Sequence, residues 1–269
     1  MSGDVGQALP PATPEFTNVW QAKAPAPPFD CIATRYDALW TDTAIGRAQR
    51  NLVWRSIDGF FHAGDRILDI GCGTGEDAAH FEGRGVHVYA TDASPAMVRV
   101  ARERGTTATV CNAEEIGRIG RSFDGAISNF GALNCVENLP AVAVSLAALV
   151  RPGGQVAICL MGRFCAWETL YYSVCLQWSK AFRRSRGAQY HGIAIHYPTV
   201  AEVRTSFAPD FELRRWIKHA DKAPHNHVVD FLLPFIEPVR SHPSRNNGKV
   251  IGDLGVIENT LRGFDPIVL

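Results

Sequence analysis

The stretch Arg66-Ile67-Leu68-Asp69-Ile70-Gly71-Cys72-Gly73-Thr74-Gly75-Glu76 decides the fold of this chain. Its apolar run, Ile67–Ile70, predicts a buried strand, and three glycines at alternate positions follow at once. Ala78, Ala79 and Phe81 then begin a helix. Glycine has no Cβ, so the backbone can turn sharply and approach a ligand closely, and the helix N-terminus beyond it presents free N–H groups. The stretch therefore predicts a strand–loop–helix cradle for a ligand.

The spacing of the glycines indicates which ligand. A dinucleotide-binding loop has the pattern Gly-x-Gly-x-x-Gly, but here Glu76 stands at the third glycine position. A carboxylate there disfavours a pyrophosphate and tolerates an ammonium group. The next predicted strand, Val86–Thr91, ends at Asp92, where an acid can bind both hydroxyls of a ribose. A ribose with an amino-acid end and no pyrophosphate describes S-adenosylmethionine.

Four motifs resemble those of class I S-adenosylmethionine-dependent methyltransferases, in the small-molecule group that includes the ubiquinone- and menaquinone-type enzymes. In chain order they are Ile67–Gly75, Asp92–Met97, the adenine-side segment Asn112–Glu114 and the turn Leu149–Gly154 before the fifth strand. Together they cover roughly residues 60 to 161. Strands alternating with helices at this spacing predict an α/β fold with a doubly wound, mostly parallel sheet. The resemblance implies a Rossmann-like sheet of seven strands with an inserted helical cap.

The resemblance also implies the residues that hold S-adenosylmethionine. They are Tyr36, Asp69, Gly71, Cys72, Gly73, Gly75, Asp92, Ala93, Met97, Asn112, Ala113, Glu114 and Asn129. Among these, Asp69 and the strand end near Asn129 would hold the ammonium group, and Asp92 the ribose hydroxyls. The side-chain oxygen of Asn112 can accept from the adenine amino group, while Met97 and Ala113 would flank the ring. Tyr36 lies in a segment that resembles the family's lid over the cofactor, although it equally fits a hydrophobic anchor.

The rest of the N-terminal half has a simple organisation. Residues 1–28 are rich in Pro, Ala and Thr, which predicts a disordered leader before a methyltransferase domain over 29–240. Apolar residues recur at helical spacing over Thr43–Phe61, and the arginines of this helix, Arg47, Arg50 and Arg55, are interpreted as its solvated side. Ser94 is expected to cap the helix after Asp92.

An insertion over about 162–197 is interpreted as the cap. The residues Trp167, Leu170, Tyr171, Val174, Trp178 and Phe182 fall at helical spacing and predict one helix with an aromatic face. Such a stripe is more often core than pocket, although the family resemblance makes some of these rings candidates for acceptor contacts. Arg183, Arg184 and Arg186 could hold an acidic substrate, but a solvated helix end is the favoured interpretation.

The C-terminal part matches the family less well. A helix over Thr199–Phe207 and a sixth strand over Phe211–Trp216 are predicted. For the seventh strand the only candidate is Val228–Leu233, and residues 241–269 form an uncertain tail.

No acid–base residue is marked as clearly as the cofactor motifs. The loop Asn129–Asn134 is expected where the methyl group emerges, so Tyr36, Asn134 and His191 are weak catalytic candidates. Ser128-Asn129-Phe130-Gly131 does not match the Asn-Pro-Pro-aromatic signature of base N-methyltransferases, which disfavours nucleic acid as substrate. The spacing of His219, Asp221, His225 and His227 matches no metal site, so no metal is expected.

Composition limits the partners further. Lys+Arg and Asp+Glu number 27 each, which gives no electrostatic reason to expect nucleic acid or an anionic membrane as partner. No apolar run approaches the roughly 20 residues of a membrane span, and no secretion signal is visible at the N-terminus. The seven cysteines include no Cys-x-x-Cys pair, which predicts reduced thiols and a cytoplasmic location.

The sequence thus predicts an enzyme that transfers a methyl group from S-adenosylmethionine to a small, partly apolar molecule, releasing S-adenosylhomocysteine. An O- or C-acceptor and direct in-line displacement are expected. Two alternatives stay open: a non-catalytic S-adenosylmethionine-binding protein, regulatory or vestigial, and an NAD-dependent oxidoreductase. The acceptor and the oligomeric state are left open.

Overall fold

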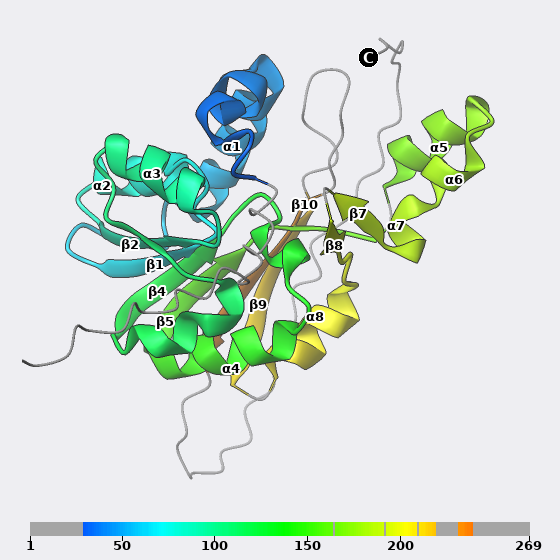
Figure 1. Ribbon diagram of the computed structural model, residues 1–269. Coiled ribbons are helices and arrows are strands. Elements are labelled where there is room, and N and C mark those ends of the chain that lie inside the picture. Colours follow the sequence, from blue (N-terminus) through cyan, green and yellow to red (C-terminus); the bar gives the residue numbers. More distant parts are fainter. Residues whose placement is uncertain (1–28, 164, 191, 209, 219–230, 239–269) are drawn as a thin grey trace, which may run out of the picture.

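The computed structural model describes residues 29–163, 165–190, 192–208, 210–218 and 231–238 (Figure 1). The expectations for the leader 1–28 and the tail 241–269 lie outside this part of the chain. The strands of the main sheet are β1 (Arg66–Ile70), β2 (His87–Asp92), β3 (Ala108–Val110), β4 (Phe123–Ser128), β5 (Val150–Ile158), β6 (Leu160–Met161), β9 (Phe211–Lys218) and β10 (Phe231–Pro238). The helices packed on it are α1 (Ala44–Ile57), α2 (Glu76–Glu82), α3 (Pro95–Glu103), α4 (Leu139–Leu149) and α8 (Val200–Phe207).

Five neighbouring strands form a parallel sheet in the order β3-β2-β1-β4-β5. Asp69 on β1 is in register with Ala90 on β2 and with Ile127 on β4. The carboxyl ends of these strands therefore meet at one edge, where an open α/β sheet binds its ligands. The predicted doubly wound α/β fold with a parallel core is confirmed.

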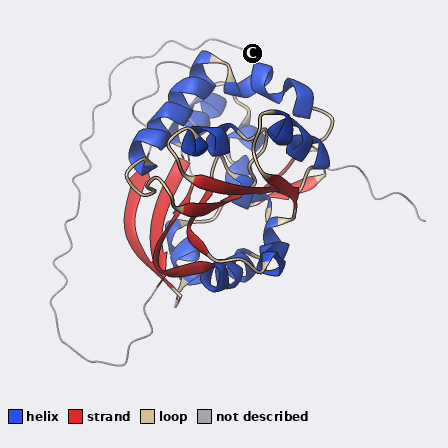
Figure 2. Cartoon of the chain, turned by 90° about the vertical axis from the view of Figure 1, so that its left-hand side faces the viewer, coloured by secondary structure: helices blue, strands red, loops and turns tan. Residues whose placement is uncertain are grey.

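Side-chain alternation along the strands divides the core into two layers, one on each face of the sheet (Figure 2). On β1, Ile67 packs against α1, α2 and α3, whereas its neighbour Leu68 packs against α4 and α8. Both residues are wholly buried. The strand reads as a continuous apolar run because both of its faces are covered.

The helix ends follow local sequence signals. The Ser94 hydroxyl accepts a hydrogen bond from the Met97 N–H, so the predicted cap of α3 is confirmed. Thr43 caps α1 in the same way, by accepting from the Gly46 N–H. At Thr199 a full capping box with Glu202 begins α8, as the predicted helix requires.

The cap differs from the prediction. Instead of one helix it contains three short ones, α5 (Ala166–Val174), α6 (Trp178–Ala181) and α7 (Arg183–Arg186), followed by the hairpin β7 (Ala188–Tyr190) and β8 (Ile193–Ile195). The helical path breaks at Leu176, which has a φ of 55°. A left-handed residue cannot continue a right-handed helix, and the apolar spacing alone carries no sign of the break.

The C-terminal side of the sheet is antiparallel. β10 pairs with β5 on one side and with β9 on the other, and it also contacts β6. The sixth predicted strand is present as β9, and β10 includes the part of the predicted Val228–Leu233 strand that the structure describes, from Phe231 on. The expected seven strands become eight among the described residues, because the predicted fifth strand is split at Cys159 into β5 and β6. Pro234 lies inside β10 and pairs with Trp216, and a proline within a strand explains why the predicted strand ended at Leu233.

Within the described residues, none of the helices is both long enough and apolar enough to cross a bilayer.

Candidate active site

The glycine loop after β1 has the backbone that only glycine adopts easily. Gly71, Gly73 and Gly75 have φ values of 74°, 54° and 81°. A Cβ on Gly71 would lie 2.2 Å from the Cβ of Ala132, so that glycine is required by close packing. A Cβ on Gly73 would meet no atom within 4 Å. The backbone at Gly73 therefore borders open space, as a ligand-binding loop requires.

Asp92 at the end of β2 ties this loop to the next strand. Its carboxylate accepts one hydrogen bond from the Gly73 N–H, at 2.9 Å, and another from the Ser94 N–H, at 2.8 Å. Burial raises the pKa of Asp92, and these two N–H donors oppose that shift. Each carboxylate oxygen keeps a free lone pair, so Asp92 can still accept from the two hydroxyls of a ribose.

A buried donor and a buried acceptor without partners lie beside the loop. Asp69 is 1% exposed, and its Oδ2 atom has no hydrogen-bond partner among the described residues. The Nδ2 atom of Asn129 is equally unpartnered there, although its Oδ1 accepts from the Phe130 N–H. Asp69 is in register with Ile127 on β4, and Asn129 directly follows the end of that strand, so both residues lie at the carboxyl edge of the sheet. Buried polar atoms usually have hydrogen-bond partners, so this pair offers one acceptor and one donor to a ligand.

Burial raises the pKa of Asp69 well above its ordinary value, and the nearby Asp77 carboxylate adds to the shift while Arg50 opposes it. A cationic group bound beside Asp69 would reverse this balance, because an opposite charge favours the ionised carboxylate.

Arg50 and Asp77 form a buried ion pair on the same side of the sheet. Arg50 Nη1 lies 2.6 Å from Asp77 Oδ2, and both side chains are 7% exposed. The Trp54 indole N–H donates to the other carboxylate oxygen at 2.7 Å, and the guanidinium lies 4.3 Å from the centroid of the Phe130 ring. The interpretation of Arg50 as solvated is therefore wrong. It failed because α2 places the Asp77 carboxylate beneath α1, a contact between distant parts of the sequence.

A strap, residues 29–42, is tied to the glycine loop by ion pairs. Asp37 accepts from the Thr74 hydroxyl at 2.7 Å and from Arg104 at 2.5 Å. Arg104 also contacts Glu76 at 2.6 Å, and Arg47 pairs with the other oxygen of Glu76. Arg47 is thus also not simply solvated, whereas Arg55 is exposed as expected. Because two arginines neutralise Glu76, its charge is no argument against a pyrophosphate.

Tyr36 lies on the strap, half-buried against a small cluster formed by Ala33, Ala96 and Met97. Nearby, Asp30 accepts hydrogen bonds from the Ser94 hydroxyl and from the Ala96 N–H. Burial raises the pKa of Tyr36, so its phenol is a hydrogen-bond donor rather than a base at neutral pH. The anchoring contact is observed, and the lid role stays a prediction.

The side chains of the adenine-side segment form hydrogen bonds to nearby backbone groups. The side-chain oxygen of Asn112 accepts from the Glu114 N–H at 3.2 Å and caps a short helix, η3 (Ala113–Ile119). Glu114 accepts from the N–H groups of Glu137 and Asn138, at 3.0 and 2.8 Å. Met97 and Cys72 are buried and Ala93 is exposed beside Asp92. The cofactor contacts of these residues stay predictions.

Asn134 is not available as a catalyst. It is wholly buried, and its side chain donates to the carbonyls of Met161, at 3.0 Å, and His196, at 2.5 Å. Its side-chain oxygen accepts from the Met161 N–H at 2.8 Å. Asn134 therefore joins the cap hairpin to the sheet. His191 and the histidine cluster around Asp221 lie outside the described residues.

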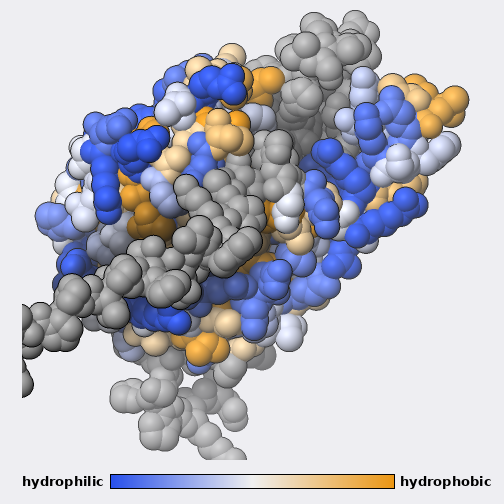
Figure 3. Space-filling model, in the orientation of Figure 1, coloured by the Kyte–Doolittle hydropathy of each residue, from blue (hydrophilic) through white to orange (hydrophobic). Residues whose placement is uncertain are grey.

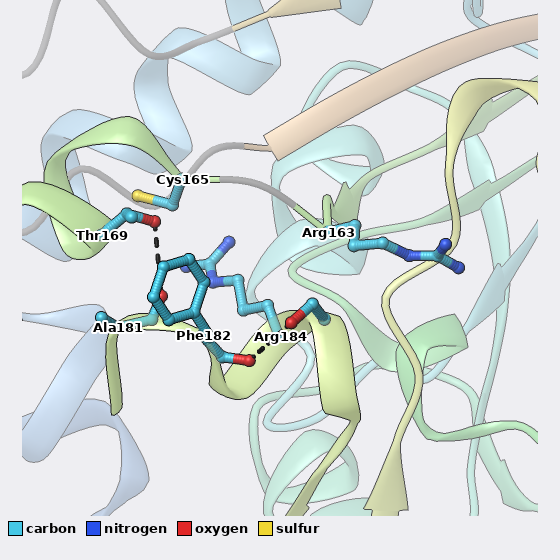
Figure 4. Close-up of a pocket in the computed structure, with 7 residues that line it drawn as sticks. Arg163, Cys165, Thr169, Ala181, Phe182 and Arg184 are labelled. Carbon is cyan, nitrogen blue, oxygen red and sulfur yellow. Dashed lines mark hydrogen bonds between the residues drawn. The ribbon is translucent and has the colours of Figure 1, made fainter. Parts of the chain in front are cut away.

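The cap contains a small pocket of about 50 Å³, away from the glycine loop (Figure 4). Arg163, Cys165, Thr169, Ala181, Phe182, Arg184 and Ser185 line it. Arg184 is 8% exposed and donates to the Gly162 carbonyl, so the prediction of a solvated helix end is wrong for Arg184. Arg183 and Arg186 are exposed, as predicted.

Comparisons with known proteins find similarity to methyltransferases. The model of a family described as "Methyltransferase domain" matches residues 67–154. A demethylmenaquinone methyltransferase of Thermobifida fusca is 32% identical over 49% of this chain and 58% of its own length. A ubiquinone biosynthesis O-methyltransferase of Xylella fastidiosa is 27% identical over a match that covers 70% of this chain and 69% of that protein. The chain spans little more than half the length of most of the curated relatives it matches.

A solved structure shares the fold. The 1,6-didemethyltoxoflavin-N1-methyltransferase of Burkholderia thailandensis, described with bound S-adenosylhomocysteine, has a TM-score of 0.53 and 20% identity, covering 79% of this chain and 87% of that one. The sequence motifs, the parallel sheet with its glycine loop and the family model coincide on the same residues. Residues 67–154 are thus similar to the methyltransferase-domain family, and the solved S-adenosylhomocysteine-bound methyltransferase shares the fold of this chain.

Proposed function

We propose that this protein transfers a methyl group from S-adenosylmethionine to a small, partly apolar acceptor, at an oxygen or a carbon, by direct in-line displacement. The unpartnered pair Asp69 Oδ2 and Asn129 Nδ2 carries the proposal. An acceptor and a donor, both buried beside a glycine loop, suit an amino-acid group that has an ammonium and a carboxylate. The cradle fits the cofactor for this reason.

Each part of the cradle has a role in this proposal. Asp69 holds the ammonium group, Asp92 accepts from the ribose hydroxyls, and Gly73 lets the backbone approach the methionine part. Met97 and Ala113 flank the adenine, and Tyr36 covers the site from the strap. When bound, the cofactor supplies an electrophilic methyl group on a sulfonium.

The chain's contribution to the rate is then mainly positioning. Holding two reactants in line converts a bimolecular step into a unimolecular one and can supply much of the acceleration. Arg50 holds the Phe130 ring at the carboxyl end of β4, where the loop to Asn134 begins. Phe130 has a φ of 50°, a strained conformation for a bulky residue, and such residues cluster at functional sites.

The names of the curated relatives support an acceptor of this kind. One is named for demethylmenaquinone and another as an O-methyltransferase of ubiquinone biosynthesis. Oxygen or carbon as acceptor atom remains part of the proposal, as does the choice of acceptor by the cap.

Calorimetric titration of S-adenosylhomocysteine tests the cofactor assignment. Wild type should bind it, and Asp92→Ala should weaken binding at least about tenfold, a loss of roughly 1.4 kcal/mol. Asp124→Ala is the matched control, because Asp124 also accepts a backbone N–H, from Arg66 at 2.6 Å, but at the amino end of β1. No binding to a folded wild type would refute the cofactor assignment.

Turnover separates an enzyme from a non-catalytic binding protein. Transfer of a labelled methyl group from S-adenosylmethionine to any member of a panel of hydroxylated aromatic acceptors supports the enzyme. Tight binding with no transfer across the panel favours the regulatory or vestigial alternative.

A further inference from the structure

The outer surface of the cap exposes an apolar patch. Its five residues, the cap patch, are Leu170, Val174, Leu176, Trp178 and Phe182. Their exposure ranges from 43% at Phe182 to 74% at Val174 and Leu176. Figure 1 shows α5 and α6 at the end of the molecule opposite α2 and α3, and Figure 3 shows apolar surface at that outer end.

Local geometry gathers these side chains. Leu170 and Val174 are four residues apart on α5 and share one helix face. The rings of Trp178 and Phe182 stack at 6.5 Å between centroids and 9° between planes. Leu176 stands between the two helices with a φ of 55°, and this left-handed turn leaves its side chain in solvent. Exposed apolar clusters of this kind mark interaction sites, because soluble surfaces rarely keep them.

The segment that carries the patch is rich in cations. Residues 169–201 contain no Asp or Glu, but they contain Lys180, Arg183, Arg184 and Arg186. Arg184 is turned inward, whereas Lys180, Arg183 and Arg186 are exposed. Lys180 lies over the Tyr172 ring at 5.5 Å, so its charge is held on α5, the helix that carries Leu170 and Val174.

The chain as a whole has a formal net charge of zero, which gave no reason to expect an anionic membrane as partner. A net charge, however, averages the positive and negative charges over the whole chain. The cap concentrates positive charge in one segment, and binding depends on the local field rather than on the net charge.

A short amphipathic surface with Trp, Phe and Leu on one side and Lys and Arg beside them is typical of segments that lie in a membrane interface. Tryptophan is enriched at this depth because its ring is apolar and its N–H is polar. We infer that the cap patch docks on an anionic lipid surface, with the apolar side chains entering the headgroup region and Lys180, Arg183 and Arg186 facing the lipid phosphates. The inference does not depend on the proposed methyl transfer.

Vesicle flotation with the full chain tests this inference. Wild type should float with vesicles of phosphatidylcholine and phosphatidylglycerol in equal parts, at least about tenfold more than with phosphatidylcholine alone. Added salt should weaken the binding, because it screens exposed charges.

Two double variants separate the contributions. Leu176→Ser with Trp178→Ser should abolish flotation, and Lys180→Gln with Arg186→Gln should remove the preference for phosphatidylglycerol. Val144→Ser with Arg118→Gln is the matched control, since Val144 is 62% exposed on α4 and the Arg118 side chain is 81% exposed on η3. This control should float like wild type. Circular dichroism checks that every variant is folded.

Flotation of the cap variants equal to wild type, or no flotation of wild type, would overturn the inference. Sedimentation without lipid addresses the competing occupant. A wild-type dimer that Leu176→Ser with Trp178→Ser converts to a monomer would assign the patch to a second copy of the chain and also overturn the inference.

Discussion

At the residue scale, Asp69 shows how the fold prepares a group for a ligand. The strand pattern placed it at the end of β1, and the two helical layers bury it with one oxygen unpartnered among the described residues. Such a carboxyl destabilises the folded chain until a cation reaches it. The proposed ammonium contact would relieve this cost, which links cofactor binding to the charge of Asp69.

The stability of the protein should therefore depend on pH through Asp69. Its pKa is raised above the ordinary value of 3.8, so the folded chain binds more protons than the unfolded chain. The stability that protonated Asp69 contributes is fully present below the unfolded pKa of 3.8, and it is lost as the pH rises through the higher folded pKa. Asp69→Asn should raise the Tm at pH 7.5 by about 2–4 °C, equivalent to roughly 1 kcal/mol.

The same variant should approach the stability of wild type as the pH falls well below 3.8, where Asp69 is neutral in both states, and it should bind S-adenosylhomocysteine more weakly. Thermal melts from pH 8 down to below 3.8 measure the first effect. An Asp69→Asn variant that is less stable than wild type at pH 7.5 would show that the ionised carboxylate has a partner after all.

At the element scale, the strap is held to the glycine loop by side chains from three helices. Asp37 and Asp42 on the strap, Arg47 on α1, Glu76 on α2 and Arg104 at the end of α3 form one network of ion pairs. Networks stabilise more than isolated surface pairs, because each cation orients two carboxylates. The network places Tyr36 beside Met97 and next to the proposed adenine site.

Removing the central arginine should release the strap. Arg104→Met keeps the length of the side chain but loses the contacts with Asp37, Glu76 and the Thr74 carbonyl. We expect faster proteolysis within residues 29–42 and weaker S-adenosylhomocysteine binding, by about 1 kcal/mol or roughly fivefold.

Arg118→Met is the control, because Arg118 pairs with Glu115 on the exposed helix η3, away from the strap. It should leave both measurements unchanged. Equal proteolysis of wild type and Arg104→Met would mean that the apolar contacts of Tyr36, not the ion pairs, hold the strap.

At the scale of the whole molecule, ligand binding and folding are linked. A ligand that binds only the folded chain stabilises it by about 2.7 kcal/mol at a hundred times its Kd. S-adenosylhomocysteine at that excess should raise the Tm by about 5–10 °C, whereas NAD at the same concentration should cause no shift.

The comparison of the two Tm shifts tests the NAD-dependent oxidoreductase alternative directly. Glu76 does not disfavour NAD, because two arginines neutralise its charge, whereas the buried Asp69 suits the cationic group of S-adenosylhomocysteine. A shift with NAD and none with S-adenosylhomocysteine would favour the oxidoreductase.

The sequence by itself determined the parallel core and the glycine cradle. These features depend on short-range preferences of the backbone, which neighbouring residues in the chain set. They are the strand Ile67–Ile70, the glycines that follow it, Asp92 and the Ser94 cap. The resemblance to a methyltransferase family rests on these same local motifs, so it follows from the sequence alone.

Only the tertiary structure decided what joins distant segments. Arg50 meets Asp77, Asn134 joins Met161 to His196, and Leu176 breaks the cap helix, and no local pattern marks any of them. The predicted seventh strand ended at Leu233, before Pro234, whereas β10 continues through this proline and pairs with β5 and β9. The physical reason is that a buried polar contact or a sheet neighbour gains its free energy from partners far away in the sequence, whereas periodicity reports only which face of an element is apolar.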